Sequence, residues 1–275
     1  MTTDVNRRVL PGFSLSLGYT LLYMSLLVAI PLGAGFLKAS HLSFGEFWAA
    51  VASERALAAY RLTVGASLAS AVINVGMGVL VAWVLVRYEF PLKGLLDSLV
   101  DLPFALPTAV AGLVYSDLFV ARGWYGRFLV PLGIQGAYSR LGIVLVLVFI
   151  GFPFVVRTLQ PVLEGLDKDV EEAAACLGAN RLQTALRVIF PSILPAVITG
   201  FALAFARSLG EYGSVVFVSG NMPFRTEIAP VLIVARLEEF AYTEATAIAV
   251  VLLTISFVTL FLINLLARWS KRHHG

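Results

Sequence analysis

The chain has 275 residues, of which 59% are hydrophobic and only 13% are charged. A soluble domain is about half apolar and about a quarter charged, so this composition indicates a membrane protein and excludes disordered, collagen-like and disulfide-scaffold proteins. The net charge of +3 is small and the basic residues are spread along the chain, which argues against nucleic acid as a partner. One cysteine and three histidines are too few and too scattered for a disulfide, a metal site or a catalytic cluster.

Six apolar stretches are long enough to cross a bilayer, since a span needs about 20 apolar residues. They are Phe13–Leu37, Tyr60–Val86, Val100–Val120, Leu141–Gln160, Ile193–Val218 and Glu244–Leu266. Arginines precede the first stretch, as in a signal peptide, but the later spans favour an uncleaved first helix. The basic residues of the loops favour cytoplasmic termini, most clearly at Arg7–Arg8 and Arg268–Arg272.

These spans predict an all-α membrane protein with a single domain, because no linker or convincing repeat divides the chain. Residues 1–12 would form a cytoplasmic N-terminus and residues 13–267 a six-helix transmembrane domain. Residues 268–275 would form a basic cytoplasmic tail. The domain would be embedded in the lipid of the plasma membrane.

Two of the spans carry features that need an explanation. In the fifth, Gly200, Ala204 and Ser208 recur at every fourth position, which allows close helix packing in lipid; ordinary bundle packing is the favoured interpretation. In the third, Pro103 and Pro107 interrupt backbone hydrogen bonding. A kinked start of the helix is favoured there over a gate, although the sequence leaves both open.

The sequence lacks the motifs of common catalytic sites. No G-x-x-x-x-G-K-[ST] loop is present, so the chain has no phosphate cradle with which to hydrolyse ATP itself. The H-E-x-x-H and G-x-S-x-G motifs are also missing. We therefore expect no catalytic residue, no bound metal and no cofactor in this chain, and a function other than that of a membrane enzyme.

Residues 161–191 form the longest polar segment and are predicted to lie in the cytoplasm as two short helices. Asp167 or Asp169 can cap the first helix, which Gly178 can end.

The second helix of this loop has a start signal and a stop signal. Asn180 can cap its beginning, with Gln183 three residues later in a weak capping-box arrangement. Pro191 is expected to stop it, because proline cannot donate a backbone hydrogen bond.

One face of the first loop helix is small and apolar. Val170, Ala173, Ala174 and Leu177 share it at three- and four-residue spacing. The face could fold back on the bundle or bind a partner, and the periodicity leaves these two interpretations open.

This loop resembles the EAA loop of ABC-importer permeases. Glu172, Ala173, Ala174, Gly178 and Pro191 stand at the spacing of that family's pattern, E-A-A-x3-G-x9-I-x-L-P. Valine and phenylalanine replace the family's isoleucine and leucine, so the side chains there remain apolar. The resemblance implies that these five residues couple the permease to a separate cytoplasmic ATPase, which would use ATP and Mg. Gly178 would then serve the turn between the two helices.

Near the middle of the fifth span, Arg207 precedes Glu211 by one helical turn. A central arginine costs about 2.5–3.5 kcal/mol on insertion scales, so it has to face protein, water or a counter-ion. The pair is either a structural salt bridge or part of an anion pathway in which Arg207 faces the anion and Glu211 holds it. Gly210 and Gly213 would let the helix unwind there.

The string around this pair, R-S-L-G-E-Y-G at residues 207–213, resembles the oxyanion permeases for sulfate and molybdate. R-V-L-P-G-F at residues 8–13, D-L-P-F-A-L-P-T-A-V-A-G-L at residues 101–113 and P-F-V-V-R-T at residues 153–158 are similar to the sulfate/thiosulfate permeases of the CysT (or CysU) type. The resemblance implies a MetI-like six-helix permease fold and a place in a bacterial inner membrane. It also implies three kinds of partner: a second, related permease subunit, two copies of an ABC ATPase and a periplasmic sulfate- or thiosulfate-binding protein.

The leading hypothesis is therefore the transmembrane half of an ATP-driven sulfate/thiosulfate importer. The alternative within this class is a homodimeric molybdate or tungstate permease, since these anions share charge and tetrahedral shape. A secondary transporter or channel would predict acidic or histidine relays and inverted repeats, and the chain shows neither clearly.

Overall fold

The computed structural model describes residues 13–273, and every regular element in that range is helical. Five helices there are long and apolar enough to cross a membrane: Phe13–Ser40, Glu54–Arg87, Arg140–Glu164, Arg181–Leu209 and Tyr242–Leu265. The predicted all-α membrane architecture is confirmed. The predicted cytoplasmic N-terminus, residues 1–12, lies outside the described residues, and so do residues 274–275.

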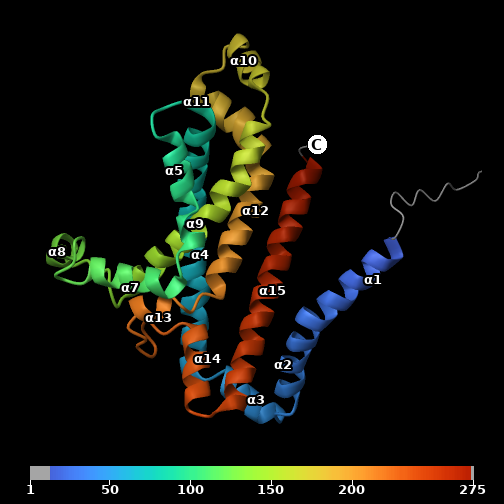
Figure 1. The fold of residues 1–275 in the computed structure, drawn as a ribbon, viewed down its shortest axis with the longest axis vertical. Helices are drawn as coiled ribbons and strands as arrows, with labels where there is room; N and C mark the ends of the chain where they lie inside the picture. The colour runs from blue at the N-terminus through green and yellow to red at the C-terminus, as the bar shows by residue number, and fades with distance from the viewer. Residues whose placement is uncertain (1–12, 274–275) are drawn as a thin grey trace, which may run out of the picture.

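The elements follow one another from one end of the molecule to the other several times (Figure 1). The first part of the chain holds α1 (Phe13–Met24), η1 (Ser25–Ala29), α2 (Ile30–Ser40), α3 (Phe44–Val51), α4 (Glu54–Arg87), α5 (Lys93–Val100), α6 (Leu102–Ala105), α7 (Thr108–Phe119), α8 (Gly126–Leu129) and η2 (Val130–Leu132). The second part holds α9 (Arg140–Glu164), α10 (Lys168–Cys176), α11 (Arg181–Thr184), η3 (Ala185–Ile189), α12 (Phe190–Leu209), α13 (Val215–Val218), α14 (Ala229–Glu238) and α15 (Tyr242–His273). We call the end that carries α10 and α11 the loop end, and the end that carries α3 and α14 the opposite end.

Three long helices, α4, α9 and α12, form the centre of the bundle, and α15 packs beside α12 (Figure 1). Glycines let their backbones approach closely. A Cβ on Gly78 of α4 would lie 2.6 Å from a methyl of Val155 on α9, and a Cβ on Gly200 of α12 would lie 3.1 Å from the Cα of the same valine. Gly200, Ala204 and Ser208 are all buried, which confirms the predicted packing face of small residues.

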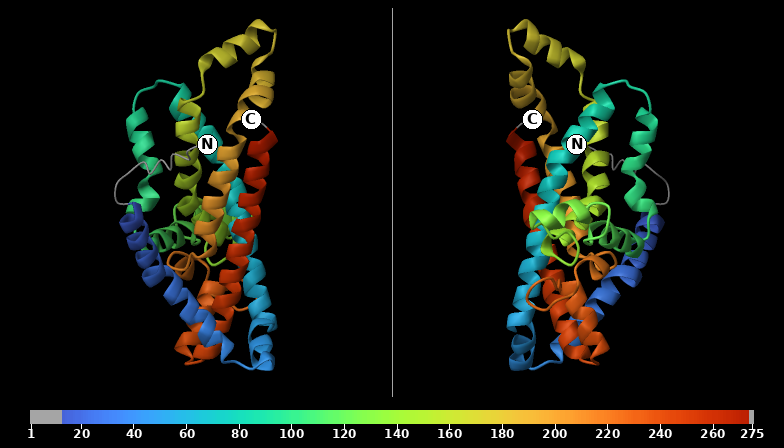
Figure 2. Two further views of the ribbon diagram at one scale, coloured as in Figure 1. Left: turned by 90° about the vertical axis from the view of Figure 1, so that its right-hand side faces the viewer. Right: turned by 90° about the vertical axis from the view of Figure 1, so that its left-hand side faces the viewer.

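The first helix lies apart from this bundle. No residue in the most apolar stretch of this helix is buried. Helix α1 points away from α15, whereas α2 contacts it (Figures 1 and 2). Its exposed apolar surface suits contact with lipid or with another protein. Residues of the predicted basic tail continue the helix α15 as far as His273, and this end of α15 lies toward the loop end (Figure 1).

The third predicted span, Val100–Val120, is wrong as a single helix. The chain forms α5, a short α6 and then α7, with Leu106 in an extended conformation between α6 and α7. The residue before a proline is pushed out of the helical region, and Pro107 follows Leu106 here. The break turns α7, which has only 12 residues, across the long helices (Figure 1). The chain therefore changes direction at the proline stretch, and α6 and α7 are separate helices instead of one kinked helix.

Candidate functional site

The loop between α9 and α11 has the predicted helix–turn–helix form. Asp167 caps α10 by accepting a hydrogen bond from the backbone N–H of Asp169, at 3.4 Å. Asn180 and Gln183 form the predicted capping box at the start of α11, with both bonds 2.9 Å long. These local signals act within four residues, so they can be identified without knowledge of the rest of the fold.

Gly178 makes the turn between the two helices. Its φ is +82°, in the left-handed region where a Cβ is unfavourable. The N–H of Gly178 donates to the carbonyl of Ala175, and the N–H of Ala179 donates to the carbonyl of Ala174. These are the two bonds of a Schellman motif, which confirms the predicted glycine end of the helix.

Pro191 does not stop the second helix, contrary to the prediction. The chain continues from α11 through the π-helical turn η3 into α12, giving one 29-residue helix from Arg181 to Leu209. Proline is tolerated near a helix start, and a wider π turn precedes it here, so the backbone hydrogen bonds are rearranged without ending the helix.

Most of the apolar face of α10 is uncovered. Ala174 is buried, but Val170, Ala173 and Leu177 are exposed. Leu177 is the most exposed of them, at 89%. Glu172 is also exposed. Two leucines of the following helix, Leu182 and Leu186, add further apolar surface at the loop end. In the described chain this face does not fold back on the bundle.

An ion pair that the sequence did not reveal ties this loop to the bundle. The guanidinium of Arg87, at the end of α4, lies 2.6 Å from the carboxylate of Glu171 on α10. It also donates to the carbonyl of Leu166, at 3.3 Å, and lies over the ring of Trp83. Arg87 lies in the last turn of α4, where a cation is favourable, but this position does not indicate its partner. Glu171 is more than 80 residues further along the chain.

The Arg207–Glu211 pair exists, but its two members have different surroundings. The guanidinium of Arg207 donates to one oxygen of Glu211 at 2.5 Å, and the N–H and hydroxyl of Ser214 both donate to the other oxygen at 2.9 Å. The side chain of Glu211 is only 3% exposed, whereas that of Arg207 is 33% exposed. The carboxylate of Glu211 therefore stabilises the turn after α12, while the side chain of Arg207 remains partly exposed.

The fifth predicted span, Ile193–Val218, is interrupted at this pair. Helix α12 ends at Leu209 with Gly210 as its C-cap, and α13 begins at Val215. Gly210 has a φ of −93° with open space beside it, so the conformation there does not require glycine. Gly213 does have a steric reason, because its Cβ would lie 2.3 Å from the hydroxyl of Thr108 on α7.

Helix α7 packs against the turn that Glu211 holds. A Cβ on Gly112 would lie 2.2 Å from the carbonyl oxygen of Ser214, so only glycine allows the observed contact. Gly112 is buried. The crosswise helix, the turn and the Arg207–Glu211 pair therefore form one packed unit.

A second charge cluster, also missed from the sequence, fixes α5 and α6 to α9. Arg157 binds both carboxylate oxygens of Asp101, at 2.6 and 2.7 Å, and one oxygen of Asp97 at 2.6 Å. Gln160 donates to the same oxygen of Asp97 at 3.0 Å. This cluster gives residues of the D-L-P-F and P-F-V-V-R-T segments a structural role.

Comparison with known proteins assigns the chain to a family. Residues 74–273 match the family described as "Binding-protein-dependent transport system inner membrane component". The chain belongs to this family, so it is a multi-pass inner membrane protein and a permease subunit of an ABC transport system, not itself an ATPase. The family also implies a separate ATPase and a periplasmic binding protein as partners.

Its relatives within that family are sulfate permeases. The sulfate transport system permease protein CysT of Salmonella typhimurium is 48% identical over 271 residues, which cover 98% of each chain. CysT of Synechococcus elongatus is 51% identical over 266 residues, covering 97% of this chain and 96% of the relative. The resemblance to the CysT type is confirmed.

The fold also has a solved counterpart. A chain in the crystal structure of a bacterial ABC transporter involved in the import of the acidic polysaccharide alginate matches with a TM-score of 0.75 at 17% identity. The match covers 93% of this chain and 94% of that chain. At this identity the likeness concerns the fold alone.

Proposed function

We propose that this chain is the permease of a sulfate importer, moving sulfate or thiosulfate inward across a bacterial plasma membrane at the expense of ATP. The observation that carries the importer mechanism is the loop 161–191, which presents an uncovered apolar face beyond the bundle and is tied to α4 and α12. The choice of sulfate rests on the CysT relatives.

In this proposal the loop couples the bundle to the ATPase. Glu172 and Ala173 are exposed on α10, where they can contact the ATPase, and Ala174 packs inward. Gly178 sets the angle between α10 and α11 through its left-handed turn. Pro191 lies where the loop helix becomes the membrane helix, next to the π turn. ATP and Mg would be used by the partner subunit only.

Arg207 is the candidate pathway residue. A third of its side chain is exposed, and a guanidinium offers forked donors that suit tetrahedral oxyanions. Glu211 would hold the arginine in place, and Gly210 lies at the helix end beside them. The ion pair also supports a purely structural role, which the mutants described in the Discussion separate from a role in the pathway.

The finer organisation belongs to the same proposal. We infer a MetI-like permease with six spans, in which the broken segment α5–α7 supplies one crossing and residues 13–267 form one domain. Both termini and the loop 161–191 would lie in the cytoplasm, with residues 268–275 as a basic tail. A second, related permease subunit and two copies of the ATPase would complete the importer, together with a periplasmic sulfate- or thiosulfate-binding protein.

The test is uptake of radiolabelled sulfate by cells that lack their own sulfate permeases and receive this chain with its partner subunits. The proton gradient is collapsed while ATP is maintained, and thiosulfate or molybdate is added as competitor. Uptake that continues on ATP and is inhibited mainly by thiosulfate supports the proposal. Loss of uptake with the gradient indicates a secondary transporter, and inhibition mainly by molybdate favours a homodimeric molybdate or tungstate permease.

A further inference from the structure

Asn74, in the middle of α4, carries a buried amide without a hydrogen-bond partner. The residue is fully buried, and neither the oxygen nor the nitrogen of its amide is bonded to another group of the described chain. Exchanging the two atoms would not change this, because both lack a partner. A buried polar group without a hydrogen bond is unfavourable and is rare in folded proteins. Asn74 therefore destabilises the arrangement in which it is observed.

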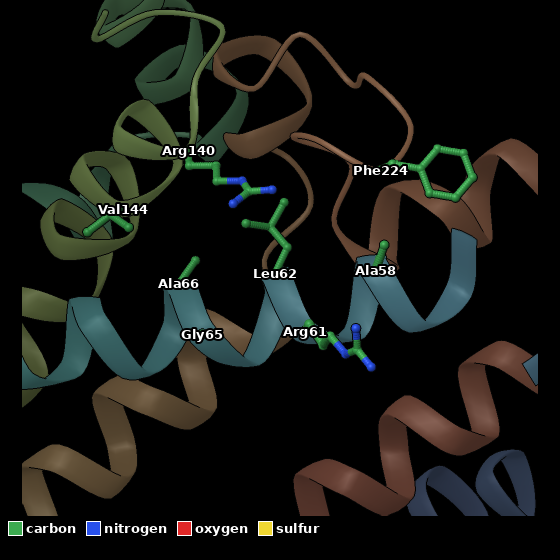
Figure 3. Close-up of a pocket in the computed structure, with 8 residues that line it drawn as sticks. All are labelled: Ala58, Arg61, Leu62, Gly65, Ala66, Arg140, Val144 and Phe224. Atoms are coloured by element: carbon green, nitrogen blue, oxygen red, sulfur yellow. The ribbon is translucent and has the colours of Figure 1, made fainter. Parts of the chain in front are cut away.

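Two pockets beside α4 do not bring water to this amide. One, of about 500 Å³, lies between residues 58–66 of α4 and the start of α9 (Figure 3). Its last lining residue on α4, Ala66, is eight positions before Asn74, which is roughly 12 Å along the helix. The other begins beside Val72 and Val75, but the side chains that line it are all apolar, so it offers water no partners. Neither pocket provides the missing hydrogen bonds.

Asn74 faces small apolar groups where α4, α9 and α12 meet. A Cβ built on Gly151 of α9 would lie 2.5 Å from the amide nitrogen of Asn74 and 3.4 Å from the methyl of Ala204 on α12. One helical turn away on each helix stands a serine, and the hydroxyls of Ser70 and Ser208 are 3.3 Å apart. The polar contact between α4 and α12 therefore lies one turn away from the amide that lacks a partner.

Short side chains recur at every fourth position along both helices at this contact. The row on α4 consists of Ser70, Asn74, Gly78 and Ala82, and the row on α12 of Ser208, Ala204, Gly200 and Ala196, all of them buried. The two helices run in opposite directions between the ends of the bundle (Figure 1). Because both rows repeat with the same period, a shift of one turn, roughly 6 Å, brings short side chains opposite short side chains again.

The contacts with α9 indicate which helix can shift. A Cβ on Gly78 of α4 would lie 2.6 Å from a methyl of Val155, too close for a larger residue of the same row to take its place. On α12, a Cβ on Gly200 would lie 3.1 Å from the Cα of Val155, which a displacement of a few tenths of an ångström relieves. Helix α12 can therefore step along α9, whereas α4 is fixed to it.

We propose that α12 has a second position, one turn toward the loop end, in which Ser208 accepts a hydrogen bond from the amide of Asn74. Ala204 then takes the place of Gly200. Ser70 loses Ser208 but keeps the bond that its hydroxyl donates to the carbonyl of Ser67, at 2.9 Å. The second position thus satisfies a group that the observed position leaves unbonded, and this brings the two positions closer in free energy.

The step would link the loop to the candidate pathway. Helix α12 is continuous with the loop 161–191, so we expect ATP binding to the partner subunit to favour the second position. Arg207 and the turn that packs on α7 adjoin Ser208, and the same step would displace both. This inference rests on the coupling role proposed for the loop, but not on sulfate as the substrate.

Disulfide crosslinking in the assembled complex locates Ser208 along α4. In a Cys176→Ala chain, Ser70→Cys/Ser208→Cys reports the observed position, and Asn74→Cys/Ser208→Cys reports the second. The β-carbons of a disulfide lie about 3.5–4.5 Å apart, so a step of one turn separates the two pairs. We expect the first pair to form about tenfold faster without nucleotide, and the second about tenfold faster after trapping with ATP and vanadate. A second pair that stays unlinked in the trapped complex would overturn the proposal.

Substitutions distinguish this role from a purely structural one by the sign of their effects. Asn74→Ala removes the unbonded amide from the observed position and the bond to Ser208 from the second, so both changes favour the observed position. The midpoint of thermal aggregation without nucleotide should rise by about 2–4 °C, while ATP-driven transport falls about tenfold. An asparagine needed only for packing would lower the midpoint instead, and that result would refute the second position.

A matched pair of serine substitutions on α12 provides the control. Ala204→Ser offers Asn74 a partner in the observed position, so it should also raise the midpoint and lower transport. Ala202→Ser changes a buried alanine outside the row, where the new hydroxyl can bond a carbonyl of its own helix, and should alter neither. Equal effects of the two serines would count against the pairing with Asn74.

Sulfate uptake by the wild-type complex, measured in parallel, separates the two proposals. A wild type that transports sulfate on ATP, with no crosslink between positions 74 and 208, leaves the proposed function standing and removes the second position. A wild type that takes up no sulfate, although this crosslink forms on trapping, removes sulfate as the substrate and supports the second position.

Discussion

The Arg207–Glu211 pair allows a structural role to be separated from a role in the anion pathway. The perturbations are Arg207→Gln, Glu211→Gln and the double variant. Each side chain can still form hydrogen bonds after the change, so the charges are the main difference. The unequal exposure of the two groups, 33% for Arg207 and 3% for Glu211, predicts unequal effects on stability.

Arg207→Gln leaves a buried carboxylate with only the two bonds from Ser214. Breaking a buried pair costs about 3–5 kcal/mol. Because the two bonds from Ser214 remain, we expect Arg207→Gln to lower the free energy of unfolding by about 3 kcal/mol. Glu211→Gln leaves an arginine that is partly hydrated, so we expect a loss of about 1–2 kcal/mol. The double variant has no unpaired charge and should lie within about 1–2 kcal/mol of wild type.

The assays are thermal aggregation of the detergent-solubilised complex and ATP-driven sulfate uptake. The midpoint of aggregation should fall most for Arg207→Gln, less for Glu211→Gln, and recover in the double variant. If Arg207 faces the anion, uptake stays low in the double variant although its stability has recovered. Full recovery of uptake would make the pair structural only. A stable Arg207→Gln protein would refute the account of Glu211 as a buried charge that needs its cation.

Three further predictions follow from the packing and the loop. Gly112→Ala should destabilise the protein by about 1–3 kcal/mol because its Cβ meets the carbonyl of Ser214, whereas Gly76→Ala, with open space, should be neutral or stabilising in the same aggregation assay. Gly178→Ala should destabilise the left-handed turn by about 1–2 kcal/mol, and Gly178→Asn should destabilise it less. The amount of ATPase that co-purifies with the permease should therefore fall more for the alanine variant. An equal fall in both variants would exclude the left-handed turn as the cause. Arg157→Ala should speed amide hydrogen exchange in α5 by about tenfold or more relative to Arg127→Ala, and unchanged exchange would show that the cluster does not hold α5.

The sequence predicted those parts of the fold that depend on local or averaged properties. Long apolar stretches locate α4, α9 and α15 because a bilayer span is set by length and hydropathy alone. Capping at Asp167 and Asn180 was predictable because each cap involves residues within three positions. The same locality made the Gly178 turn predictable.

The errors arose where backbone chemistry depends on neighbours in space. Hydropathy across Val100–Val120 could not show that Leu106 would be extended, although the following proline favours it. Pro191 read as a stop because the π turn before it, which allows the helix to continue, has no clear sequence signal.

Contacts between distant residues were also beyond reach. Arg157 and Asp97 are 60 positions apart, and nothing in a single sequence indicates that α5 lies against α9. The same holds for Arg87 and Glu171. Both clusters use residues whose charge was visible in the sequence, so the missing information was the arrangement of the helices and not the type of side chain.

The continuity of the helix through Pro191 bears directly on how the proposed coupling would work. One helix of 29 residues, roughly 40 Å long, runs from Arg181 in the loop to Leu209 beside the Arg207–Glu211 pair. The helix is unbroken over that length, so a displacement of the loop reaches the turn at Gly210 through one continuous element, with the π turn, Pro191 and Pro195 as the points at which it can bend. The turn after α12 packs against α7 at Gly112, and the ion pair of Arg87 with Glu171 holds the loop to α4. The proposed route from ATPase to pathway thus consists of contacts between packed elements, which is the physical requirement for coupling two distant sites.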